Sequence, residues 1–272
     1  MTLEQYPWAG KVRMPAAWGA LIDYAAPTWN HPERGPIPRA APITSYDWFI
    51  IHYGGGNNPA GDLDPDDYQP PWFDKLKATI GIVRGVIQSW ERYHIFSKKW
   101  RGMAYTAGVD QFGRLFGMRG TVQNGGQYGS EWNNYSMAVV SIMGGSQKPS
   151  RWMRKRIARM ILEHPPKKGV LTHQMTGYPT SCAGPHWQPW VENRQWVAEL
   201  GTQRVGKRNR TVLALRKRLH DLSYFDYEFG NQYTPAVARA VVNYQRDRGL
   251  KEDGIAGPTT FADLIDIETE GD

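Results

Sequence analysis

Short apolar runs bounded by turn-forming residues recur through the first two thirds of the chain and predict buried β-strands. Residues 46–53 form such a run, rich in aromatic and β-branched side chains, which stops at three consecutive glycines. Two more strands are predicted around the turn 110–113, whose Gly113 suits the left-handed position of a hairpin. Residues 137–142 and 169–172 complete the set of predicted strands.

Helical periodicity appears between these strands. From residue 74, apolar side chains recur at spacings of four and three residues, which predicts an amphipathic helix that ends near Phe96. The expected buried stripe consists of Leu76, Ile80, Val83, Ile87 and Trp90. His94 lies near the end of this helix, and we expect it to be a cation that interacts with the helix C-terminus.

The spacing of apolar and basic side chains over residues 150–164 predicts a second helix with one strongly basic face. Its inward-facing side chains are expected to be Met153, Ile157, Met160 and Ile161. Its basic side chains are Arg151, Arg154, Lys155, Arg156 and Arg159. Two interpretations of the charges stay open: a solvated face, or a patch that binds an anionic wall polymer. Since strands alternate with helices and a hairpin lies in the middle, the pattern predicts an α/β fold with a mixed central sheet flanked by helices.

The end of the chain follows a purely helical pattern. Three helices are marked by Val212, Leu215 and Leu219, by Val237, Val241 and Tyr244, and by a turn at 253–258 that opens a short helix ending near Leu264. They predict a small three-helix C-terminal domain. We therefore expect an N-terminal extension packed on the first domain (1–42), the α/β domain (43–200), a polar, basic linker (201–210) and the three-helix domain (211–272).

Composition and charge narrow the possible classes of function. Hydrophobic residues make up 40% and charged residues 22% of the 272 positions, as in ordinary globular proteins. The single cysteine excludes an intrachain disulfide framework. Because neither a signal-peptide pattern nor an apolar run of membrane-spanning length is found, we expect a protein that stays in a cytoplasm until something releases it. The net charge of +7, concentrated before residue 206, suits a polyanion such as nucleic acid, anionic lipid or a wall phosphate polymer.

One loop-rich segment holds the only cysteine, Cys182, and a histidine nine positions before it, His173. Together with His52, at the end of the first predicted strand, they offer two imidazoles and one thiolate. Zinc with three protein ligands and one open position is the catalytic arrangement, and it would activate water for hydrolysis of an amide or ester. Tyr105 and Thr180 are the candidates that would stabilise the resulting oxyanion. A core histidine and a buried free thiol remain the alternatives for His52 and Cys182.

Several short motifs occur in one order and together carry a family resemblance. They are Ile51-His52-Tyr53-Gly54, the stretch from Trp100 through Tyr105 to Arg114, Arg119-Gly120, Asn134 before an apolar strand, and His173 followed by Thr180-Ser181-Cys182-Ala183-Gly184-Pro185. Over residues 44–190 the chain resembles the zinc-dependent N-acetylmuramoyl-L-alanine amidases of the type 2 family, akin to peptidoglycan recognition proteins and T7-type lysozyme. The resemblance implies their fold and the hydrolysis of the amide between N-acetylmuramic acid and L-alanine.

The resemblance also implies roles for individual residues. It implies one zinc ion per chain, bound by His52, His173 and Cys182. It implies that Tyr105 and Thr180 assist the metal-bound water and stabilise the oxyanion, although some relatives carry lysine at the Thr180 position. Many relatives have Cys-Pro-Gly where this chain has Cys182-Ala183-Gly184. The Gly-Ala-His that often precedes the Asn-bearing strand appears here as Gly126-Gln127, so no histidine ligand is expected there.

A second resemblance covers residues of about 206–266, which are similar to the three-helix peptidoglycan-binding module. The residues that carry it are Phe229-Gly230, Thr234, Ala236-Val237, Val241, Tyr244-Gln245, Gly249-Leu250, Asp253-Gly254-Ile255, Gly257-Pro258, Thr260 and Leu264. This resemblance implies binding to the bacterial wall. Such tethering would raise the local concentration of an enzyme on its insoluble substrate.

The two resemblances together imply a bacteriophage endolysin. Such a hydrolase waits in the host cytoplasm until a holin opens the membrane, and then it acts on bacterial peptidoglycan. We expect a monomer that neither binds nucleic acid nor inserts into a membrane. Two alternatives remain: a non-catalytic peptidoglycan receptor on the same fold, and a zinc peptidase that cuts within the stem peptide. Receptors of this kind often lose the cysteine ligand, whereas this chain retains Cys182.

Overall fold

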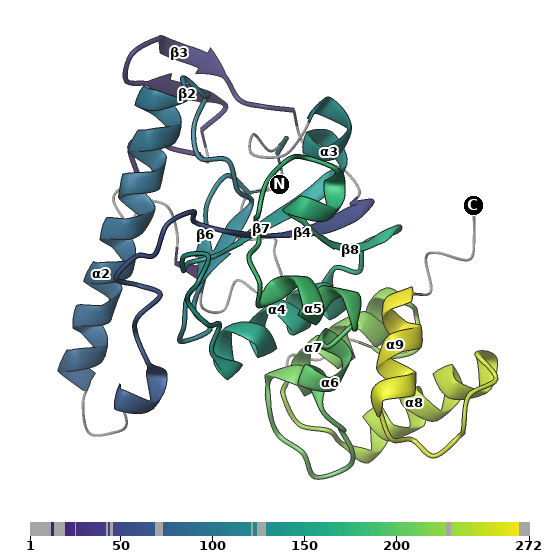
Figure 1. The fold of residues 1–272 in the computed structure, drawn as a ribbon. Helices are drawn as coiled ribbons and strands as arrows, with labels where there is room; N and C mark the ends of the chain where they lie inside the picture. The colour runs from purple at the N-terminus through teal and green to yellow at the C-terminus, as the bar shows by residue number, and fades with distance from the viewer. Residues whose placement is uncertain are drawn as a thin grey trace.

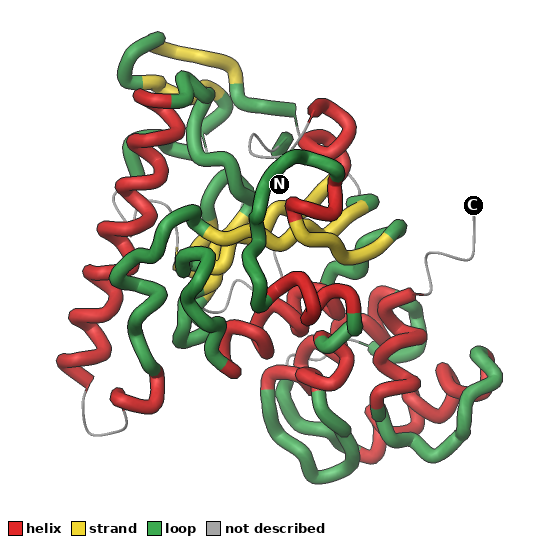
Figure 2. Tube along the Cα trace, in the orientation of Figure 1, coloured by secondary structure: helices red, strands yellow, loops and turns green. Residues whose placement is uncertain are grey.

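A central sheet lies between helices in the computed structural model, and a smaller helical unit follows at the C-terminal end (Figure 1). Figure 2 shows the strands of this sheet gathered in the middle, with helices on either side. The structure describes residues 12–13, 20–24, 26–41, 43, 46–68, 73–120, 122–123, 129–226 and 230–266.

The central sheet has six strands in the order β1-β6-β5-β7-β4-β8. Their bounds are Val12–Arg13 (β1), Trp48–Tyr53 (β4), Ala107–Val109 (β5), Leu115–Gly117 (β6), Ser136–Ser141 (β7) and Gly169–Thr172 (β8). Strand β4 pairs in parallel with both β7 and β8, while β5 pairs in parallel with β7 and antiparallel with β6. The sheet therefore mixes parallel and antiparallel pairs, which confirms the predicted mixed α/β fold.

Each face of the sheet is covered by one long helix. Since successive side chains of a strand point to opposite faces, the central strands can supply both cores. Phe49 of β4 belongs to the hydrophobic cluster that includes α4 (Arg151–Glu163). Val140 of β7 belongs to the cluster that includes α2 (Phe73–Arg92) on the other face. Shorter helices complete the domain: α3 (Gly129–Tyr135), α5 (Trp187–Glu192) and α6 (Trp196–Leu200).

In the middle of helix α2, two of the side chains predicted to be buried are buried in the structure. Val83 and Ile87 are fully buried, while the side chain of Leu76 lies outside the described residues. Trp90 lies so close to Gly54 that a β-carbon at Gly54 would overlap the indole ring. Glycine directly after β4 therefore lets the helix pack against the end of the strand.

The end of α2 corrects the prediction for His94. The helix continues as a π-helical turn, Tyr93–Ser97, which carries the His94 ring into the interior, where it is 6% exposed. The ring stacks on Trp100, with centroids 4.9 Å apart. Burial, assisted by the nearby positive charge of Arg119, lowers the pKa of His94 to about 4. The ring is neutral near pH 7, so the predicted C-terminal cation was wrong.

The described part of the N-terminal segment lies against the α/β domain. Strand β2 (Thr28–His31) pairs with β3 (Gly35–Pro38) in a hairpin close to the C-terminal end of α2 (Figure 1). Ile22, Tyr24 and Trp29 are buried in the cluster that includes α2. Residues 1–11, 14–19, 25 and 42 and the pair Gly126-Gln127 fall outside the described residues.

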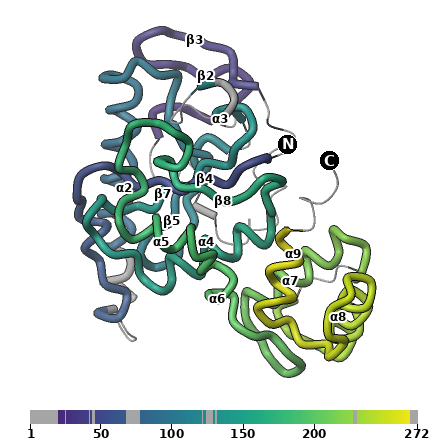
Figure 3. The backbone as a smooth tube through the Cα atoms, turned by 45° about the vertical axis from the view of Figure 1, so that its right-hand side comes forward, coloured from purple at the N-terminus to yellow at the C-terminus, as the bar shows by residue number. Residues whose placement is uncertain are grey.

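Three helices form the C-terminal domain, as predicted. They are α7 (Arg210–Asp221), α8 (Pro235–Asp247) and α9 (Pro258–Asp266). The side chains of Asn209 and Thr234 cap the first turns of α7 and α8, and Pro235 suits the first helical position. In Figure 3 this domain lies to one side of the sheet.

The segment 201–210, expected as a linker, is bonded to the C-terminal domain. Gln203 forms an antiparallel bridge with Ala256, and Arg208 forms another with Gln232. Both bridges connect residues that are more than 20 positions apart in the sequence. The segment therefore enters the C-terminal domain as part of its structure.

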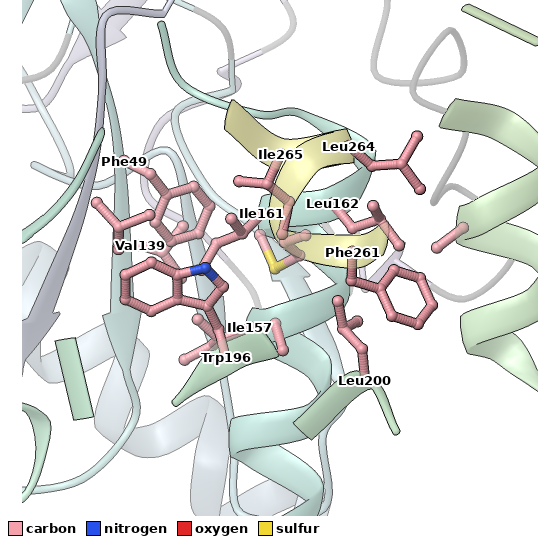
Figure 4. Packing of buried hydrophobic residues seen from close by; sticks show 14 of the residues in the cluster. Phe49, Val139, Ile157, Ile161, Leu162, Trp196, Leu200, Phe261, Leu264 and Ile265 are labelled. Carbon is pink, nitrogen blue, oxygen red and sulfur yellow. The ribbon is translucent and has the colours of Figure 1, made fainter. Parts of the chain in front are cut away.

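A hydrophobic interface joins the two domains, and we call the contact of α4 with α7 and α9 the domain interface. Phe261, Leu264 and Ile265 of α9 lie near Ile161 and Leu162 of α4 (Figure 4). All five side chains are at most 3% exposed. The hydrophobic cluster that contains them also contains Phe49 of the sheet, so one core runs through both domains.

The basic face of α4 is partly enclosed by neighbouring elements of the α/β domain. Arg156 is 6% exposed, and its Nε donates to the carbonyl oxygen of Gly113 at 3.0 Å. Arg154 pairs with Glu199 of α6 at 2.6 Å. Arg151 remains on the surface. The interpretation of the whole face as solvated was wrong, because contacts within the α/β domain bury Arg156 and hold Arg154, while Arg151 and Lys155 stay exposed.

Candidate metal centre

Two neighbouring parallel strands deliver two histidines to the same edge of the sheet. In the register of β4 with β8, Ile51 lies opposite Thr172, so the next residues, His52 and His173, are neighbours. Their ring centroids are 4.7 Å apart. Both side chains are buried, with exposed fractions of 1% and 8%.

The loop after β8 brings Cys182 back to these histidines. The N–H of Gln174 donates to the carbonyl oxygen of Cys182 at 2.6 Å and closes the loop. The N–H of Tyr53 donates to Cys182 Sγ at 3.3 Å, and Sγ lies 3.7 Å from Nδ1 of His52. Backbone contacts at both ends of the loop thus fix the thiol beside the first histidine.

We call the side chains of His52, His173 and Cys182 the ligand cluster. Each offers one ligand atom, and the three atoms all lie within 4.8 Å of one another. Nε2 of His173 is buried and has no hydrogen-bond partner among the described residues. A buried nitrogen without a partner costs free energy, which a bound cation would offset. Two imidazoles and a thiolate are a donor set that suits zinc.

Burial keeps the ligand cluster uncharged when no cation is bound. It lowers the pKa of His52 well below the ordinary value, helped by the nearby His173, and lowers the pKa of His173 to about 4. Burial also raises the pKa of the Cys182 thiol to about 12, opposed by the hydrogen bond from Tyr53. A divalent cation reverses this last effect, because it stabilises the thiolate directly. The two imidazoles are therefore neutral near pH 7, whereas Cys182 becomes a thiolate only when a cation is bound.

Tyr105, the first of the two predicted oxyanion partners, lies beside the ligand cluster. Its ring centroid is 5.1 Å from that of His52, and the side chain is partly exposed. Burial raises the pKa of the Tyr105 phenol, and the Cys182 and Tyr53 side chains raise it further. The phenol therefore keeps its proton near pH 7 and can act as a hydrogen-bond donor.

Thr180, the second predicted partner, is bonded within the ligand loop. Its Oγ1 accepts a hydrogen bond from the N–H of Cys182 at 3.2 Å. That bond uses a lone pair of the hydroxyl group and leaves its proton available for another acceptor. The structure thus places Thr180 next to the backbone of a ligand residue.

Three further residues support the cluster and were missed by sequence reasoning. Tyr178 stacks on His173 with centroids 5.2 Å apart and an interplanar angle of 4°. The hydroxyl of Ser141 donates to the carbonyl oxygen of His52 at 2.7 Å, and the indole N–H of Trp187 donates to that hydroxyl. Tyr178 could have been found, because it lies between the predicted ligands His173 and Cys182 in the sequence. Nothing in the sequence around Ser141 or Trp187 indicates their roles.

Comparison with protein families gives one match, in the C-terminal domain. The family model described as "Putative peptidoglycan binding domain" matches residues 208–264, which include all of α7 and α8 and most of α9. A comparison with curated proteins gives no match. The family match therefore applies to the C-terminal domain rather than to the whole chain.

Solved structures similar to this chain include insect and human peptidoglycan recognition proteins (PGRP). Drosophila PGRP-LB is 17% identical, with a TM-score of 0.41 over 68% of this chain and 92% of that one. Apis mellifera PGRP-SA is 16% identical, with a TM-score of 0.47 over 67% and 95%. Human PGRP-IBETAC, in complex with glycosamyl muramyl pentapeptide, is 14% identical, with a TM-score of 0.44 over 65% and 92%. At these identities and scores, neither an activity nor a ligand follows from the likeness.

Among the described residues, every helix is too short or too polar to cross a membrane.

Proposed function

We propose that the protein is a zinc-dependent amidase that hydrolyses the bond between N-acetylmuramic acid and L-alanine in bacterial peptidoglycan. The observation that carries the proposal is the ligand cluster, with its buried His173 nitrogen that lacks a partner among the described residues. The motifs of residues 44–190, which resemble type 2 amidases, support the choice of bond. The family match over residues 208–264 supports peptidoglycan as the partner.

In this proposal the ligand cluster holds one zinc ion per chain through two imidazole nitrogens and the Cys182 sulfur. Zinc bound by three protein ligands supplies a Lewis acid that lowers the pKa of water and polarises a carbonyl. The two histidines serve as neutral ligands, in agreement with their lowered pKa values. Tyr178 and Ser141 hold His173 and His52 in place through stacking and a backbone hydrogen bond.

Tyr105 and Thr180 supply hydrogen-bond donors to the substrate. As the amide carbon becomes tetrahedral, its oxygen gains negative charge, and a preorganised donor stabilises that charge. Tyr105 fits this role because its phenol stays protonated beside His52. Thr180 can donate its hydroxyl proton while its oxygen accepts from the N–H of Cys182.

The proposal includes the biological setting of a bacteriophage endolysin. The enzyme stays in the host cytoplasm as a monomer until a holin opens the membrane, and then it acts on the wall. The C-terminal domain binds peptidoglycan, and the domain interface packs it against α4, so binding and cleavage occur on two domains that share one hydrophobic core. Neither nucleic acid nor membrane insertion has a part in this proposal.

Product analysis tests the proposed reaction. Purified peptidoglycan is incubated with the protein, and both new reducing ends and new amino-terminal L-alanine are measured. An amidase releases L-alanine amino termini without new reducing ends. Reducing ends alone would contradict the proposal and indicate a glycosidase. Amino termini of other residues would indicate a zinc peptidase, and wall that is bound but uncut would indicate a non-catalytic receptor.

A further inference from the structure

The loop 99–104, which leads to Tyr105, has neither helical nor strand structure, yet its backbone is held at several points. Side chains of the N-terminal segment make many of these contacts. This loop is far from that segment in sequence, with separations of 65 to 79 residues between the bonded pairs. A backbone segment without its own hydrogen-bond ladder depends on such partners for its position.

The β2–β3 hairpin holds the start of the loop. Nδ1 of His31 accepts the N–H groups of Glu33 and Arg34, so the ring proton lies on Nε2. That nitrogen donates to the carbonyl oxygen of Trp100 at 3.1 Å. The guanidinium of Arg34 donates to the carbonyl oxygen of Lys99 at 2.5 Å. The hairpin thus bonds two successive carbonyl groups of the loop.

Tyr24 holds the end of the loop. Its hydroxyl accepts the N–H of Met103 at 2.6 Å and donates to Oε1 of Glu91 at 2.7 Å. The other carboxylate oxygen of Glu91 accepts the N–H of Leu21 at 2.8 Å. Tyr24 and Glu91 are at most 1% exposed, and inside a protein such linked hydrogen bonds strengthen one another. The loop, the N-terminal segment and α2 are therefore joined through one buried phenol.

His94 and Arg119 complete the support next to Tyr105. Nδ1 of His94 accepts the N–H of Ala104 at 3.3 Å, and its ring meets the ring of Tyr105 edge-on, with centroids 5.7 Å apart. The N–H of Arg119 donates to the carbonyl oxygen of Tyr105 at 3.0 Å. Its guanidinium donates to the carbonyl oxygen of Met103. Every residue from 103 to 105 thus has a backbone group bonded to another part of the domain.

We propose that Tyr24, His31 and Arg34 form a clamp that positions Tyr105 at the ligand cluster. The inference rests on the proposed function, in which Tyr105 donates to the oxyanion. It gives the N-terminal segment a role in catalysis through the loop 99–104, without contact with substrate. Since a misplacement of about 1 Å can cost on the order of 100-fold in rate, a loosened clamp should lower kcat with little change in KM.

Tyr24→Phe tests the clamp, because it removes one hydroxyl and keeps the buried ring. We expect kcat on a soluble muramoyl peptide to fall about 10-fold, with KM and zinc content unchanged. Hydrogen exchange of the Met103 N–H should become faster, and the ring NMR signals of Tyr105 should shift. Arg34→Ala, a substitution of an exposed side chain, should change the Tyr105 signals in the same direction by a smaller amount.

Two controls separate positioning from general loss of stability. Tyr135→Phe makes the same chemical change at a side chain that is 49% exposed, and it should leave every readout unchanged. Ile157→Val removes a buried methyl group from the other core, away from the loop; it should lower the unfolding midpoint but leave kcat and the Tyr105 signals as in the wild type. A value of kcat for Tyr24→Phe equal to that of Ile157→Val, or unshifted Tyr105 signals, would overturn the clamp. Wild-type protein without amidase activity would instead contradict the proposed function, while the exchange and NMR readouts would still test the clamp.

Discussion

The ligand cluster and the domain interface both bury polar side chains, but their charges are arranged in opposite ways. In the ligand cluster, two neutral imidazoles and a neutral thiol face one another. In the domain interface, the Glu163 carboxyl is buried close to the guanidinium groups of Arg156 and Arg159. Burial raises the pKa of Glu163, and the two positive charges oppose that rise.

The two regions differ in whether the buried polar groups have a counter-charge within the chain. Buried groups of opposite charge offset each other's desolvation within the domain interface, although Oε2 of Glu163 and Nε of Arg159 also lack a hydrogen-bond partner among the described residues. The ligand cluster contains a buried nitrogen with no partner in the described part of the chain, and its atoms converge on one point. Burial of polar groups alone does not mark a functional site. Convergence of ligand atoms without an internal counter-charge is the more specific sign.

The largest expected effect comes from removal of a ligand. Cys182→Ser should lower amidase activity by at least about 100-fold, because even residues that only support metal ligands contribute 10- to 100-fold. Activity is measured as release of L-alanine amino termini, and circular dichroism checks that the variant is folded. A folded Cys182→Ser protein with wild-type activity would show that the thiol is not needed for amidase activity. The contrast between the ligand cluster and the domain interface would then have no functional meaning.

A smaller effect is expected beside the cluster. Tyr105→Phe should lower kcat by about 100-fold, since a single oxyanion donor typically contributes 10²- to 10³-fold, while zinc content stays at the wild-type value. Steady-state kinetics with metal analysis of the same preparation provide the measurement. Unchanged kcat would remove Tyr105 from the proposed mechanism and leave the ligands as the functional core of the site.

Substitutions in the domain interface should lower the free energy of unfolding rather than change catalysis. Phe261→Ala, at a fully buried position, should lower the free energy of unfolding by about 3–5 kcal/mol. Because one hydrophobic core joins both domains, denaturant unfolding of the wild type should show a single transition. The matched control, Val205→Ala, changes a side chain that is 54% exposed and should cost less than about 0.5 kcal/mol. An equal loss for both variants would contradict the buried interface.

Acid should weaken the folded state through His94. Its pKa is about 4 in the folded chain because of burial, against 6.5 ordinarily, so between these values the unfolded chain binds the extra proton. Stability therefore falls as pH decreases from 6.5 to 4, by about 1.4 kcal/mol per pH unit for one group. Denaturant unfolding of metal-free protein at several pH values should show a shallower fall for His94→Gln. Equal pH dependence in both proteins would contradict a neutral, buried His94.

The smallest effect is expected at the exposed end of the basic helix. Arg151 pairs with Asp66 at 3.2 Å, but both side chains are more than half exposed. Arg151→Ala should therefore change the free energy of unfolding by less than about 0.5 kcal/mol. A loss as large as that of Phe261→Ala would mean that the surface and interior parts of α4 do not differ as described.

Sequence patterns predicted the features that depend on short stretches of chain. Strands β4 to β8, the Ser150-capped helix α4 and the three C-terminal helices follow from local periodicity and turn residues, whereas β1 to β3 of the N-terminal segment were not predicted. The residues of the ligand cluster could be predicted from residue type and position at strand ends, and the parallel register of β4 with β8 then brings the two histidines together. The identity of a bound metal and the roles of Tyr105 and Thr180 stay predictions.

The errors have a common physical cause, which is contact between distant parts of the chain. His94 was assigned as a cation because its helix was considered alone, whereas the Ala104 N–H and the Trp100 ring enclose it. The interpretation of the basic face of α4 as solvated, one of the two left open, considered that helix alone, whereas α9, about 100 residues later, packs on it. Local periodicity contains no information on either partner.

Metal analysis of purified protein tests directly whether His52, His173 and Cys182 bind zinc. Wild-type protein and Cys182→Ser are stripped with a chelator, incubated with zinc, and freed of excess metal before elemental mass spectrometry. We expect close to one zinc per wild-type chain, and far less for the folded variant. Wild-type protein that retains no zinc, or a variant that retains as much as the wild type, would contradict a metal centre at His52, His173 and Cys182.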